Sequence, residues 1–524
     1  MLLAWESDEV RAAEAPLLAA GVPLMDRAAF ALAVWVAREL RARRGRVGGA
    51  RVVLLVGGGN NGGDALYAGA HLARRGAAVL AVLTSTRVHE GGLAALVAAG
   101  GRVLAARDEA LYSEARDDEA RDDETSVARA ADEAAGADVV LDALLGIGGR
   151  GALRGAGGGL VQALRARGVG LGGGAGRDAG GPLVVAVDVP SGIGVDDGTL
   201  PGPVLAADLT VTFGGAKPGL LLPPAAAFAG RVEVVEVGLT GLAQVPPAVA
   251  RLDLDDVAAL WPVPGAQAQK YTRGVLGVVA GTRAYPGAAV LATGAAVRAG
   301  VGMVRYLGDV ADAVLAAHPE VVVGPGRVQA WVLGPGVDEA DEAQTGRVDR
   351  ALDEALRAAS PAVVDAGALA RLPERVGPLV VLTPHAGELA ALLAARGERV
   401  DRVGVEAEPL RWARRAHQLT GATVLLKGAV TIVVGPGGAV YAQADAPAWL
   451  ATAGSGDVLA GLLGALLAGR AGDLADDPTL LPALAAAAAC VHGLAAHVAT
   501  PGGPVSASAV AEALPATIAA VLAR

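Results

Sequence analysis

The chain has 524 residues, which is too long for one ordinary globular domain and predicts two large ones. Its formal net charge of −10 argues against non-specific binding to nucleic acid or to anionic membranes, because both depend on an excess of lysine and arginine. A single cysteine, Cys490, excludes an intrachain disulfide and fits a reducing, cytoplasmic compartment.

The mean hydropathy of +0.45 raises the question of a membrane span. The most apolar stretch, residues 480–499, is interrupted by Pro482, His492 and His497 and lacks flanking basic and aromatic anchors. We therefore expect a buried alanine-rich helix there and no membrane association. The first residues have neither a basic nor an apolar segment typical of a secretory signal.

The first half of the chain predicts an α/β domain. Apolar residues at helical spacing indicate one or two helices within residues 8–43. A strand at 51–56, a helix at 65–75 and a strand at 78–83 then form a βαβ unit, which implies a parallel sheet with a right-handed crossover.

Three aspartates follow predicted strands of this domain. Asp64 closes the glycine-rich loop GGGNNGGD, while Asp142 and Asp188 end short strands at 138–142 and 183–188. Ligands of open α/β sheets bind outside the carboxyl ends of the strands, so these carboxylates are expected to share one crevice. The alternatives are a glycine-rich turn that uses asparagine for left-handed backbone and aspartates that cap loops.

Two segments interrupt this half. Residues 107–124 contain a near-repeat, EARDD, and predict a solvated excursion or a frayed helix. Residues 155–181 are glycine-rich on both sides of a short helix and predict a loose surface insertion. Neither segment is expected to be catalytic.

Proline-rich segments place a domain boundary between residues 240 and 265. A second series of strands and helices then begins, which predicts another α/β domain. Its strands are expected at 275–280, 331–334, 362–365, 379–382 and 424–427.

The segment ATAGSGDVLAG, residues 451–461, is a loop of small residues that opens into an apolar helix. Unpaired N–H groups and a partial positive charge at a helix start attract phosphate, and Gly454, Ser455 and Gly456 let it approach closely. Asp457 would then lie where it can take a proton from a hydroxyl that attacks the phosphate. The alternative is a capped turn in which Asp457 only favours the helix dipole.

Three further strand-to-helix or strand-end loops strengthen the phosphate hypothesis. They are GTRAYPGAA at 281–289, TPHAGE at 383–388 and LLKG, in which Lys427 is a natural phosphate partner. His385 could instead be an ordinary loop histidine, and Lys427 an ordinary edge-strand lysine. Four such loops in one domain are hard to explain by structure alone.

Taken together with LGPG, these motifs resemble the ADP/ATP-dependent NAD(P)H-hydrate dehydratases, a branch of the ribokinase-like superfamily, over residues 265–524. The resemblance implies that Asp457 is the catalytic base. It implies that the hydrated dinucleotide contacts Ala288, Gly336, His385 and Asp457, and that the adenine nucleotide contacts Lys427, Gly428, Ala429, Val430, Thr431 and Gly456. Bacterial members generally use ADP, which we predict here with Mg²⁺ on the phosphates; ATP stays open.

The N-terminal motifs GGGNNGGD, LDALLGIG and DVPSGI, with Arg27 in LMDRAA, resemble the NAD(P)H-hydrate epimerase domain over residues 1–240. The resemblance implies a K⁺ site at Asn61, Asp142 and Ser191. It implies substrate contacts from Asn60, Asn61, Gly62, Gly63, Asp64, Gly146, Ile147, Gly148, Gly149, Arg150, Gly151, Ala152 and Asp188. Asp188 is our choice for the carboxylate that assists inversion at C6 by proton transfer.

The two halves together are similar to the bifunctional, YjeF-type NAD(P)H-hydrate repair enzymes. The expected fold is α/β with two domains, an N-terminal Rossmann-like parallel sheet with flanking helices and a C-terminal ribokinase-like domain. The expected limits are 1–240 for the epimerase, 241–264 for a linker and 265–524 for the dehydratase. Such an enzyme interconverts the R and S hydrates of NADH and NADPH (NADHX and NADPHX) and dehydrates the S form. We also expect a homo-oligomer.

Two other readings stay open. A small-molecule kinase of the ribokinase superfamily would explain the C-terminal loops, but it leaves GGGNNGGD and DVPSG without a role. Alternatively, the N-terminal domain is a binding module without catalysis, against which the intact Asp188 speaks.

Overall fold

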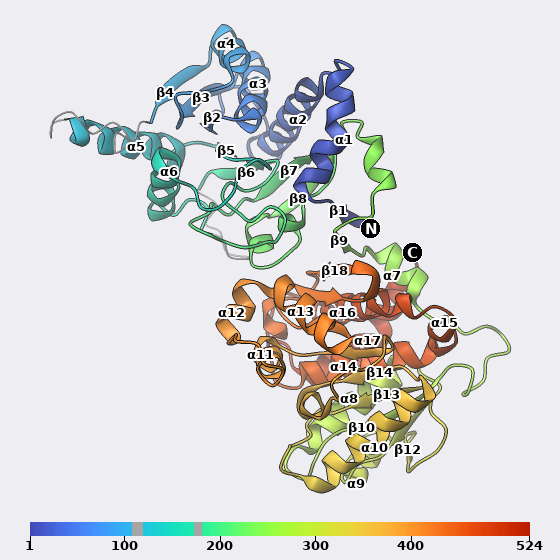
Figure 1. The fold of residues 1–524 in the computed structure, drawn as a ribbon. Coiled ribbons are helices and arrows are strands. Elements are labelled where there is room, and N and C mark those ends of the chain that lie inside the picture. Colours follow the sequence, from blue (N-terminus) through green and yellow to red (C-terminus); the bar gives the residue numbers. More distant parts are fainter. Residues whose placement is uncertain (107–118, 172–180) are drawn as a thin grey trace. The chain divides into compact units, whose positions relative to one another are not determined.

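The computed structural model describes residues 1–106, 119–171 and 181–524 and separates into two compact units (Figure 1). One unit is Leu3–Pro247, and the other is Ala248–Arg524 with Met1–Leu2. Most of the predicted excursion at 107–124 lies outside the described residues. The α/β fold predicted for both halves is confirmed.

The N-terminal unit contains a seven-stranded sheet in which every pairing is parallel. Because helices cover both faces, its central strands are continuous apolar runs. In spatial order the strands are β4 (Arg102–Ala105), β3 (Ala78–Leu83), β2 (Arg51–Val56), β5 (Val139–Ala143), β6 (Leu183–Val187), β7 (Leu209–Phe213) and β8 (Arg231–Val235).

Separate apolar clusters pack on the two faces of this sheet. Leu32, Leu66 and Leu96 belong to one cluster, and Ala130 and Leu160 belong to the other. The first face is therefore covered by α2 (Leu24–Arg44), α3 (Asn60–Arg74) and α4 (Glu90–Ala98), with α1 (Ser7–Ala19) joining through its Val10. The second face is covered by α5 (Glu119–Ala135) and α6 (Gly155–Ala166).

The short helix expected within residues 155–181 is present, but the prediction that the segment is a loose surface insertion is wrong for its first part. Residues 155–166 form α6, in which Leu160, Val161 and Leu164 are fully buried against the sheet. Glycine lowers helix propensity, but burial of an apolar face overrides propensity. Residues 172–180 lie outside the described residues.

The C-terminal unit contains an eleven-stranded mixed sheet. The strands from β10 to β16 pair with one another in parallel. The pairs β16–β17 and β17–β18 are antiparallel. In spatial order the strands are β1 (Leu2–Ala4), β9 (Val249–Arg251), β18 (Val440–Gln443), β17 (Thr431–Val434), β16 (Thr423–Leu426), β15 (Val380–Leu382), β14 (Ala362–Val364), β13 (Ala330–Leu333), β10 (Val275–Val279), β11 (Met303–Tyr306) and β12 (Val322–Val323).

Eleven α-helices are described in this unit. They are α7 (Leu254–Leu260), α8 (Pro286–Arg298), α9 (Ala311–Ala317), α10 (Glu342–Ala358), α11 (Ala386–Ala394), α12 (Arg402–Ala407), α13 (Pro409–Thr420), α14 (Ser455–Gly469), α15 (Ala471–Asp476), α16 (Leu481–Ala499) and α17 (Ala507–Leu522). The short helix α15 connects α14 and α16. Both β9 and α7 fall inside the stretch 241–264 that the sequence assigned to a linker, and Asp253 caps α7.

The core of the C-terminal unit is built around α14, which is apolar on all sides. Every residue of α14 from Val458 to Ala468 is buried, and α8, α16 and α17 contribute to the same cluster. The segment Pro478–Ala499 is long and apolar enough to cross a membrane by length and composition, but 78% of its most apolar window is buried inside the unit. This burial agrees with the predicted alanine-rich core helix.

Close contact between α14 and α8 fixes where α14 begins. A Cβ atom on Gly461 would lie 2.1 Å from the carbonyl oxygen of Ala292 in α8, so only glycine fits there.

We expect Gly461→Ala to lower the free energy of unfolding of this unit by about 2 kcal/mol, because an added methyl group must push two helices apart. Urea unfolding of the full chain measures the change. Gly472→Ala in α15 is the matched control, since its Cβ would meet nothing within 4 Å. Equal unfolding midpoints for the two variants would contradict the close contact.

Candidate active sites

The first turn of α14 has no side-chain cap, so its backbone could receive an anion. Gly454 caps the helix in a left-handed conformation, with φ of 87°, and its Cβ would lie 2.6 Å from Leu291 of α8. A Cβ on Gly456 would lie 3.4 Å from Nζ of Lys427. The backbone N–H groups of this turn therefore have a lysine beside them and no bulky side chain over them.

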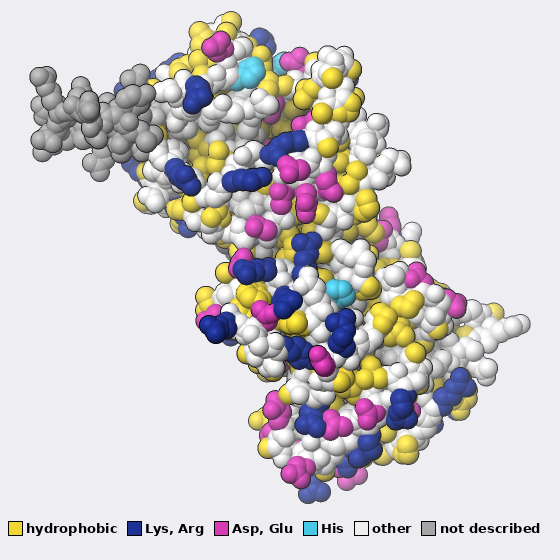
Figure 2. Space-filling model, in the orientation of Figure 1, with side chains coloured by type: hydrophobic (Ala, Val, Ile, Leu, Met, Phe, Trp, Pro, Cys, Tyr) yellow, Lys and Arg dark blue, Asp and Glu magenta, His cyan; other side chains and the backbone are white. Residues whose placement is uncertain are grey.

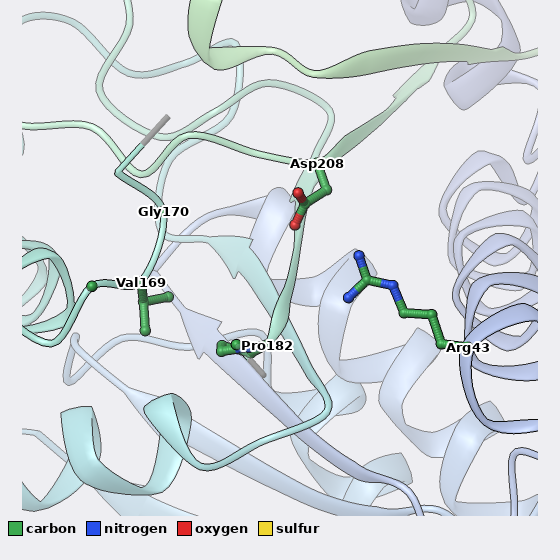
Figure 3. A pocket seen from close by; sticks show the side chains of 7 residues that line it. Arg43, Val169, Gly170, Pro182 and Asp208 are labelled. Atoms are coloured by element: carbon green, nitrogen blue, oxygen red, sulfur yellow. The ribbon is translucent and has the colours of Figure 1, made fainter. Parts of the chain in front are cut away.

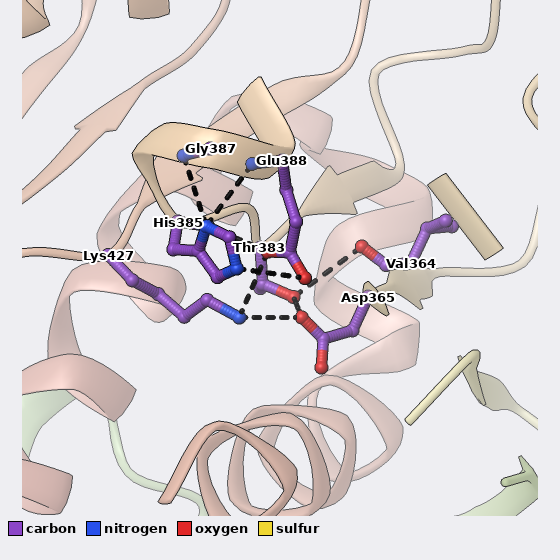
Figure 4. Close-up of polar contacts among 7 residues, drawn as sticks. All are labelled: Val364, Asp365, Thr383, His385, Gly387, Glu388 and Lys427. Atoms are coloured by element: carbon purple, nitrogen blue, oxygen red, sulfur yellow. Dashed lines mark hydrogen bonds and ion pairs between the residues drawn. The ribbon is translucent and has the colours of Figure 1, made fainter. Parts of the chain in front are cut away.

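Lys427 joins this turn to the ends of two other strands (Figure 4). Its Nζ lies 2.9 Å from Oδ1 of Asp365, which follows β14, and 3.6 Å from Oε2 of Glu388 in α11. Thr383 Oγ1 donates to the same Asp365 oxygen over 2.8 Å. The buried carboxylate of Asp365 is thus the nearer of the two acidic partners of Lys427.

His385 and Glu388 form a reciprocal cap of α11 (Figure 4). The ring Nδ1 of His385 accepts from the backbone N–H groups of Gly387 and Glu388, each over 3.1 Å, and the backbone N–H of His385 donates to Oε2 of Glu388 over 2.8 Å. The backbone of Lys427 donates to the carbonyl of Pro384 over 2.8 Å, which ties the loops after β15 and β16 together.

Asp457 has a strongly perturbed acidity. Burial, reinforced by the negative charges of Asp365 and Glu388, raises its pKa to about 7, although Lys427 opposes the shift. Burial disfavours the charged form of Lys427, but Asp365, Glu388 and Asp457 outweigh it and raise the lysine's pKa. The pair therefore consists of a firmly charged lysine and a carboxyl group that can exchange its proton near neutral pH.

The remaining predicted residues of this unit lie at the same edge of the sheet. Gly336 follows β13 with φ of 62°, and its Cβ would lie 2.4 Å from Cβ of Ala288 in the first turn of α8. Gly428, Ala429 and Val430 form the turn between β16 and β17, and Thr431 begins β17. Because Leu291 of α8 contacts Gly454, the Ala288–Gly336 contact adjoins the turn that carries Asp457.

His492 of α16 lies behind this turn. Burial lowers its pKa to about 4, partly offset by a hydrogen bond with the backbone of Ser455, so the ring is neutral at physiological pH. Its Nε2 is buried and has no hydrogen-bond partner among the residues that the structure describes.

The glycine-rich loop of the N-terminal unit folds into the first turn of α3. A Cβ on Gly62 would lie 2.5 Å from the carbonyl oxygen of Gly57, and a Cβ on Gly63 would lie 3.0 Å from the ring of His89. Asn60 to Asp64 are therefore packed tightly after β2, where the parallel strands end.

The predicted potassium ligands meet at this edge. Asp142 is fully buried, and its Oδ2 accepts from the backbone N–H of Ser191 over 2.8 Å. Ser191 Oγ accepts from the backbone N–H of Leu145 over 2.9 Å. The next residue, Gly146, would place a Cβ 3.1 Å from the side chain of Asn61, so the structure brings all three predicted ligands together.

Two observations show that this group suits a cation. Within the described part of the chain, neither Oδ1 nor Nδ2 of the buried Asn61 side chain has a hydrogen-bond partner. Burial raises the pKa of Asp142, against the hydrogen bonds from Ser191 and Leu144, because the carboxylate loses hydration. A monovalent cation held by carboxylate, amide and hydroxyl oxygens would offset the charge of Asp142 and give Oδ1 of Asn61 a partner.

Asp188 forms a buried ion pair that sequence reasoning did not anticipate. Its Oδ1 lies 2.5 Å from Nζ of Lys217 and accepts from Thr212 Oγ1 over 3.0 Å. Lys217 is only 1% exposed. Asp188 adopts φ of 66°, a left-handed conformation that is uncommon for aspartate.

Two further carboxyl groups interact with this pair. Burial, then the charges of Asp188 and Glu14, raise the pKa of Asp64 well above its ordinary value, and Lys217 opposes the shift. Burial also raises the pKa of Glu14 in α1, with the same lysine opposing.

The loop after β5 holds the other predicted substrate residues. The carbonyl of Ile147 accepts from Nη2 of Arg11 over 2.5 Å, and the backbone N–H of Gly149 donates to Gly146 over 3.0 Å. Gly148, Arg150 and Gly151 are exposed, and Ala152 lies against Gly202.

Comparisons with known proteins identify the family of each unit. The profile of a family described as NAD(P)H-hydrate dehydratase matches residues 276–515, and that of the YjeF-related protein N-terminus matches residues 22–219. A bifunctional NAD(P)H-hydrate repair enzyme of Mycobacterium tuberculosis is 46% identical over 478 residues, covering 88% of each chain. The chain belongs to the bifunctional NAD(P)H-hydrate repair enzymes.

Each half also has its own relatives. An NAD(P)H-hydrate epimerase of Clavibacter michiganensis is 46% identical over 234 residues, which is 44% of this chain and 88% of that protein. A crystal structure of the ADP/ATP-dependent NAD(P)H-hydrate dehydratase of Bacillus subtilis, obtained with ATP and Mg²⁺, covers 52% of this chain and 99% of that one, with 28% identity and a TM-score of 0.45. The two family profiles and the bifunctional relative show that this repair enzyme combines an epimerase with a dehydratase.

The sequence analysis of this repair enzyme missed several residues that shape the two sites. Asp365 ends a predicted strand, just as Asp142 and Asp188 do, and this signal could have identified it. Lys217 lies in the segment FGGAKPG after a strand, but its partner is 29 residues away and no local pattern reveals the pairing. Glu14 looks like an ordinary exposed helix residue until α1 is placed.

A cavity of about 420 Å³ lies elsewhere in the epimerase unit (Figure 3). Arg43 and Asp208 line it, and Asp208 accepts from the backbone N–H of Val184 at the start of β6. It therefore lies at the amino ends of the strands, away from the site. On the face drawn in Figure 2, basic side chains lie among acidic ones, as expected for a protein whose ligands are small molecules.

Proposed function

We propose that the C-terminal unit dehydrates (S)-NAD(P)HX at the expense of ADP and releases AMP and phosphate. The observation that carries this proposal is Asp457, with its pKa of about 7, in the first turn of α14 beside Lys427. Hydroxide is a poor leaving group, and phosphorylation of the C6 hydroxyl converts it into a good one.

The residues divide this chemistry between them. The N–H groups of α14 and the Lys427 ammonium would hold the transferred phosphoryl group, and a bound Mg²⁺ would neutralise negative charge on the nucleotide. Asp457 takes the proton of the C6 hydroxyl as its oxygen attacks phosphorus and the bond to AMP breaks. The ring nitrogen then expels phosphate from C6, and loss of a proton from C5 restores the ring double bond.

The other predicted contacts complete this proposal. Ala288, Gly336 and His385 would bind the hydrated dinucleotide, because they adjoin the Asp457 turn or the Lys427 loop. The turn 428–430 and Thr431 would bind the adenine nucleotide together with Lys427 and Gly456. The glycine at 336 leaves room for a ligand to approach the backbone.

We further propose that the N-terminal unit interconverts (R)- and (S)-NAD(P)HX. Asp188, fixed by Lys217, would exchange protons with water or with the C6 hydroxyl. Asn60 to Asp64 and Gly146 to Ala152 would bind the substrate, and Asn61, Asp142 and Ser191 would hold K⁺, which would orient the two loops. The proposed units keep the limits 1–240 and 265–524, in a cytoplasmic homo-oligomer.

The first test offers a mixture of R and S NADHX with ADP and Mg²⁺ and follows NADH formation by absorbance. We expect complete conversion by the wild-type chain, conversion that stops at the S fraction for Asp188→Ala, and none for Asp457→Ala. A parallel reaction with ATP decides the nucleotide preference.

Other outcomes of this assay are equally informative. Absence of NADH with either nucleotide would overturn the dehydratase proposal and favour a small-molecule kinase. Wild-type conversion that stops at the S fraction would leave the N-terminal unit as a binding module.

The pH dependence tests the role of Asp457. A base must be deprotonated, so kcat for (S)-NADHX should rise with pH through about 7. Asp365→Asn removes a negative neighbour, which should lower the pKa of Asp457 and move this rise to lower pH. An unchanged profile in Asp365→Asn would argue that another group titrates.

Potassium should act on the epimerase alone. Replacing K⁺ by Li⁺ is expected to slow conversion of the R form while turnover of the S form stays constant. K⁺ should also raise the Tm of the wild-type epimerase unit but not that of Asn61→Ala, because a ligand that binds only the folded state stabilises it. A K⁺-dependent Tm in Asn61→Ala would place the ion elsewhere.

A further inference from the structure

Asp188 is held through only one of its two carboxylate oxygens. Its Oδ1 accepts from Nζ of Lys217 over 2.5 Å, from Oγ1 of Thr212 over 3.0 Å and from the backbone N–H of Phe213 over 3.3 Å. None of the residues that the structure describes bonds to Oδ2, and yet Oδ2 is not among the fully buried polar atoms that lack a partner. Solvent or a ligand therefore reaches Oδ2.

The lysine of this cluster, Lys217, has no donor left for a substrate. An ammonium group has three N–H donors. Here Nζ lies 2.5 Å from Oδ1 of Asp188, 2.9 Å from Oγ1 of Thr212 and 3.1 Å from the carbonyl oxygen of Phe213. The side chain of Lys217 is 1% exposed and that of Asp188 is 11% exposed. A ligand can therefore reach the aspartate but not the lysine.

Thr212 joins the lysine to the aspartate. It lies in β7 and is fully buried. Its hydroxyl group accepts from Lys217 over 2.9 Å, and the nearest acceptor for its one proton is Oδ1 of Asp188 at 3.0 Å, ahead of the carbonyl of Gly215 at 3.4 Å. The side-chain torsion that rotates a carboxylate has only broad minima, so these bonds, rather than a rotamer, decide which oxygen of Asp188 faces the site.

We propose that Oδ2 of Asp188 is the atom that exchanges protons during epimerisation, and that Thr212 is a positioning residue which, together with Lys217, keeps Oδ2 turned toward the substrate. The inference rests on the proposed epimerase function and deepens it, because it assigns the proton transfer to one oxygen atom and adds a residue that never touches the substrate. A proton-transfer group is effective only when it is held within hydrogen-bond reach of the reacting atom.

Protons and electrons balance over one epimerisation. When the C6 hydroxyl group departs, Oδ2 gives it a proton, the C6–O electron pair leaves on oxygen as water, and the lone pair of the ring nitrogen forms a double bond to C6. When water adds to C6, the lone pair returns to nitrogen and Oδ2 takes the extra proton. One departure and one addition leave Asp188 unchanged, and nothing is oxidised or reduced.

The test uses Thr212→Val in the full chain, because valine keeps the shape of threonine and replaces only the hydroxyl group. Conversion of (R)-NADHX is coupled to an excess of the Asp188→Ala chain, which supplies the dehydratase without the proposed epimerase. We expect kcat to fall about tenfold, a part of the roughly 100-fold or more that a positioned acid–base group contributes, with KM unchanged. Thr212→Ser keeps a hydroxyl group and should restore most of the rate.

Thr210 provides a matched control in the same strand. It is also fully buried, and its Oγ1 donates to the carbonyl of Ala229 over 2.6 Å. Thr210→Val thus removes one buried hydroxyl group and its hydrogen bond without changing the bonds to Asp188. We expect its kcat to match the wild type while its Tm falls about as far as that of Thr212→Val, which separates loss of positioning from loss of stability.

Three results would overturn the inference. They are a wild-type kcat in Thr212→Val, a change confined to KM, and an equal loss of kcat in Thr210→Val. If valine at position 212 prevents folding, Thr212→Ala takes its place in the same assay. A wild-type chain that does not convert the R form, or an Asp188→Ala chain that converts it alone, would instead overturn the proposed epimerase function or the role of Asp188 in it.

Discussion

In each unit a lysine pairs with a buried aspartate at the end of a parallel strand, and this ion pair sets the charge around it. Lys217 pairs with Asp188 in one unit, and Lys427 pairs with Asp365 in the other. Burial raises the pKa values of the nearby Asp64 and Asp457, their negative neighbours add to the shift, and the lysines oppose it only in part. A similar electrostatic arrangement on two different folds thus surrounds a carboxyl group whose pKa is raised, to about 7 in the case of Asp457.

Packing determines where these groups stand. In the C-terminal unit the apolar helix α14 lies inside the core, and its glycine contact with α8 fixes the position of the turn that carries Asp457. In the N-terminal unit, glycines at 57, 62 and 146 let three loops approach within contact distance. The positions of the site carboxyl groups and their raised pKa values therefore have the same cause, since the burial that positions these groups also removes their hydration.

Sequence patterns predicted much of this architecture. Continuous apolar runs located the buried strands of both sheets, because such strands differ in composition from the loops around them. Glycine-rich motifs located the loops after β2 and before α14, and strand-end aspartates located Asp142 and Asp188. These features are local in the sequence, so they can be recognised without knowledge of tertiary contacts.

The parts that were missed depend on residues distant in the sequence. Lys217 acquires its role only when β6 and β7 lie side by side, and Glu14 only when α1 lies over the loops. At α6 the glycine-rich composition predicted a loose surface segment, whereas the helix is packed because its leucines contact the sheet. Pairing across a sheet edge leaves no periodic signal in either segment.

Asp188 combines a left-handed backbone conformation, which favours glycine, with a carboxylate that the ion pair with Lys217 needs. Glycine would adopt φ of 66° without steric cost, whereas aspartate is held there by its bonds to Lys217 and Thr212. Substitution of Asp188 by glycine would thus relieve the strain in the backbone, but it would remove the carboxylate that the proposed chemistry requires. Loss of the Asp188 side chain would also leave the buried ammonium of Lys217 without its carboxylate partner, so stability and the proposed chemistry favour the same residue despite its backbone conformation.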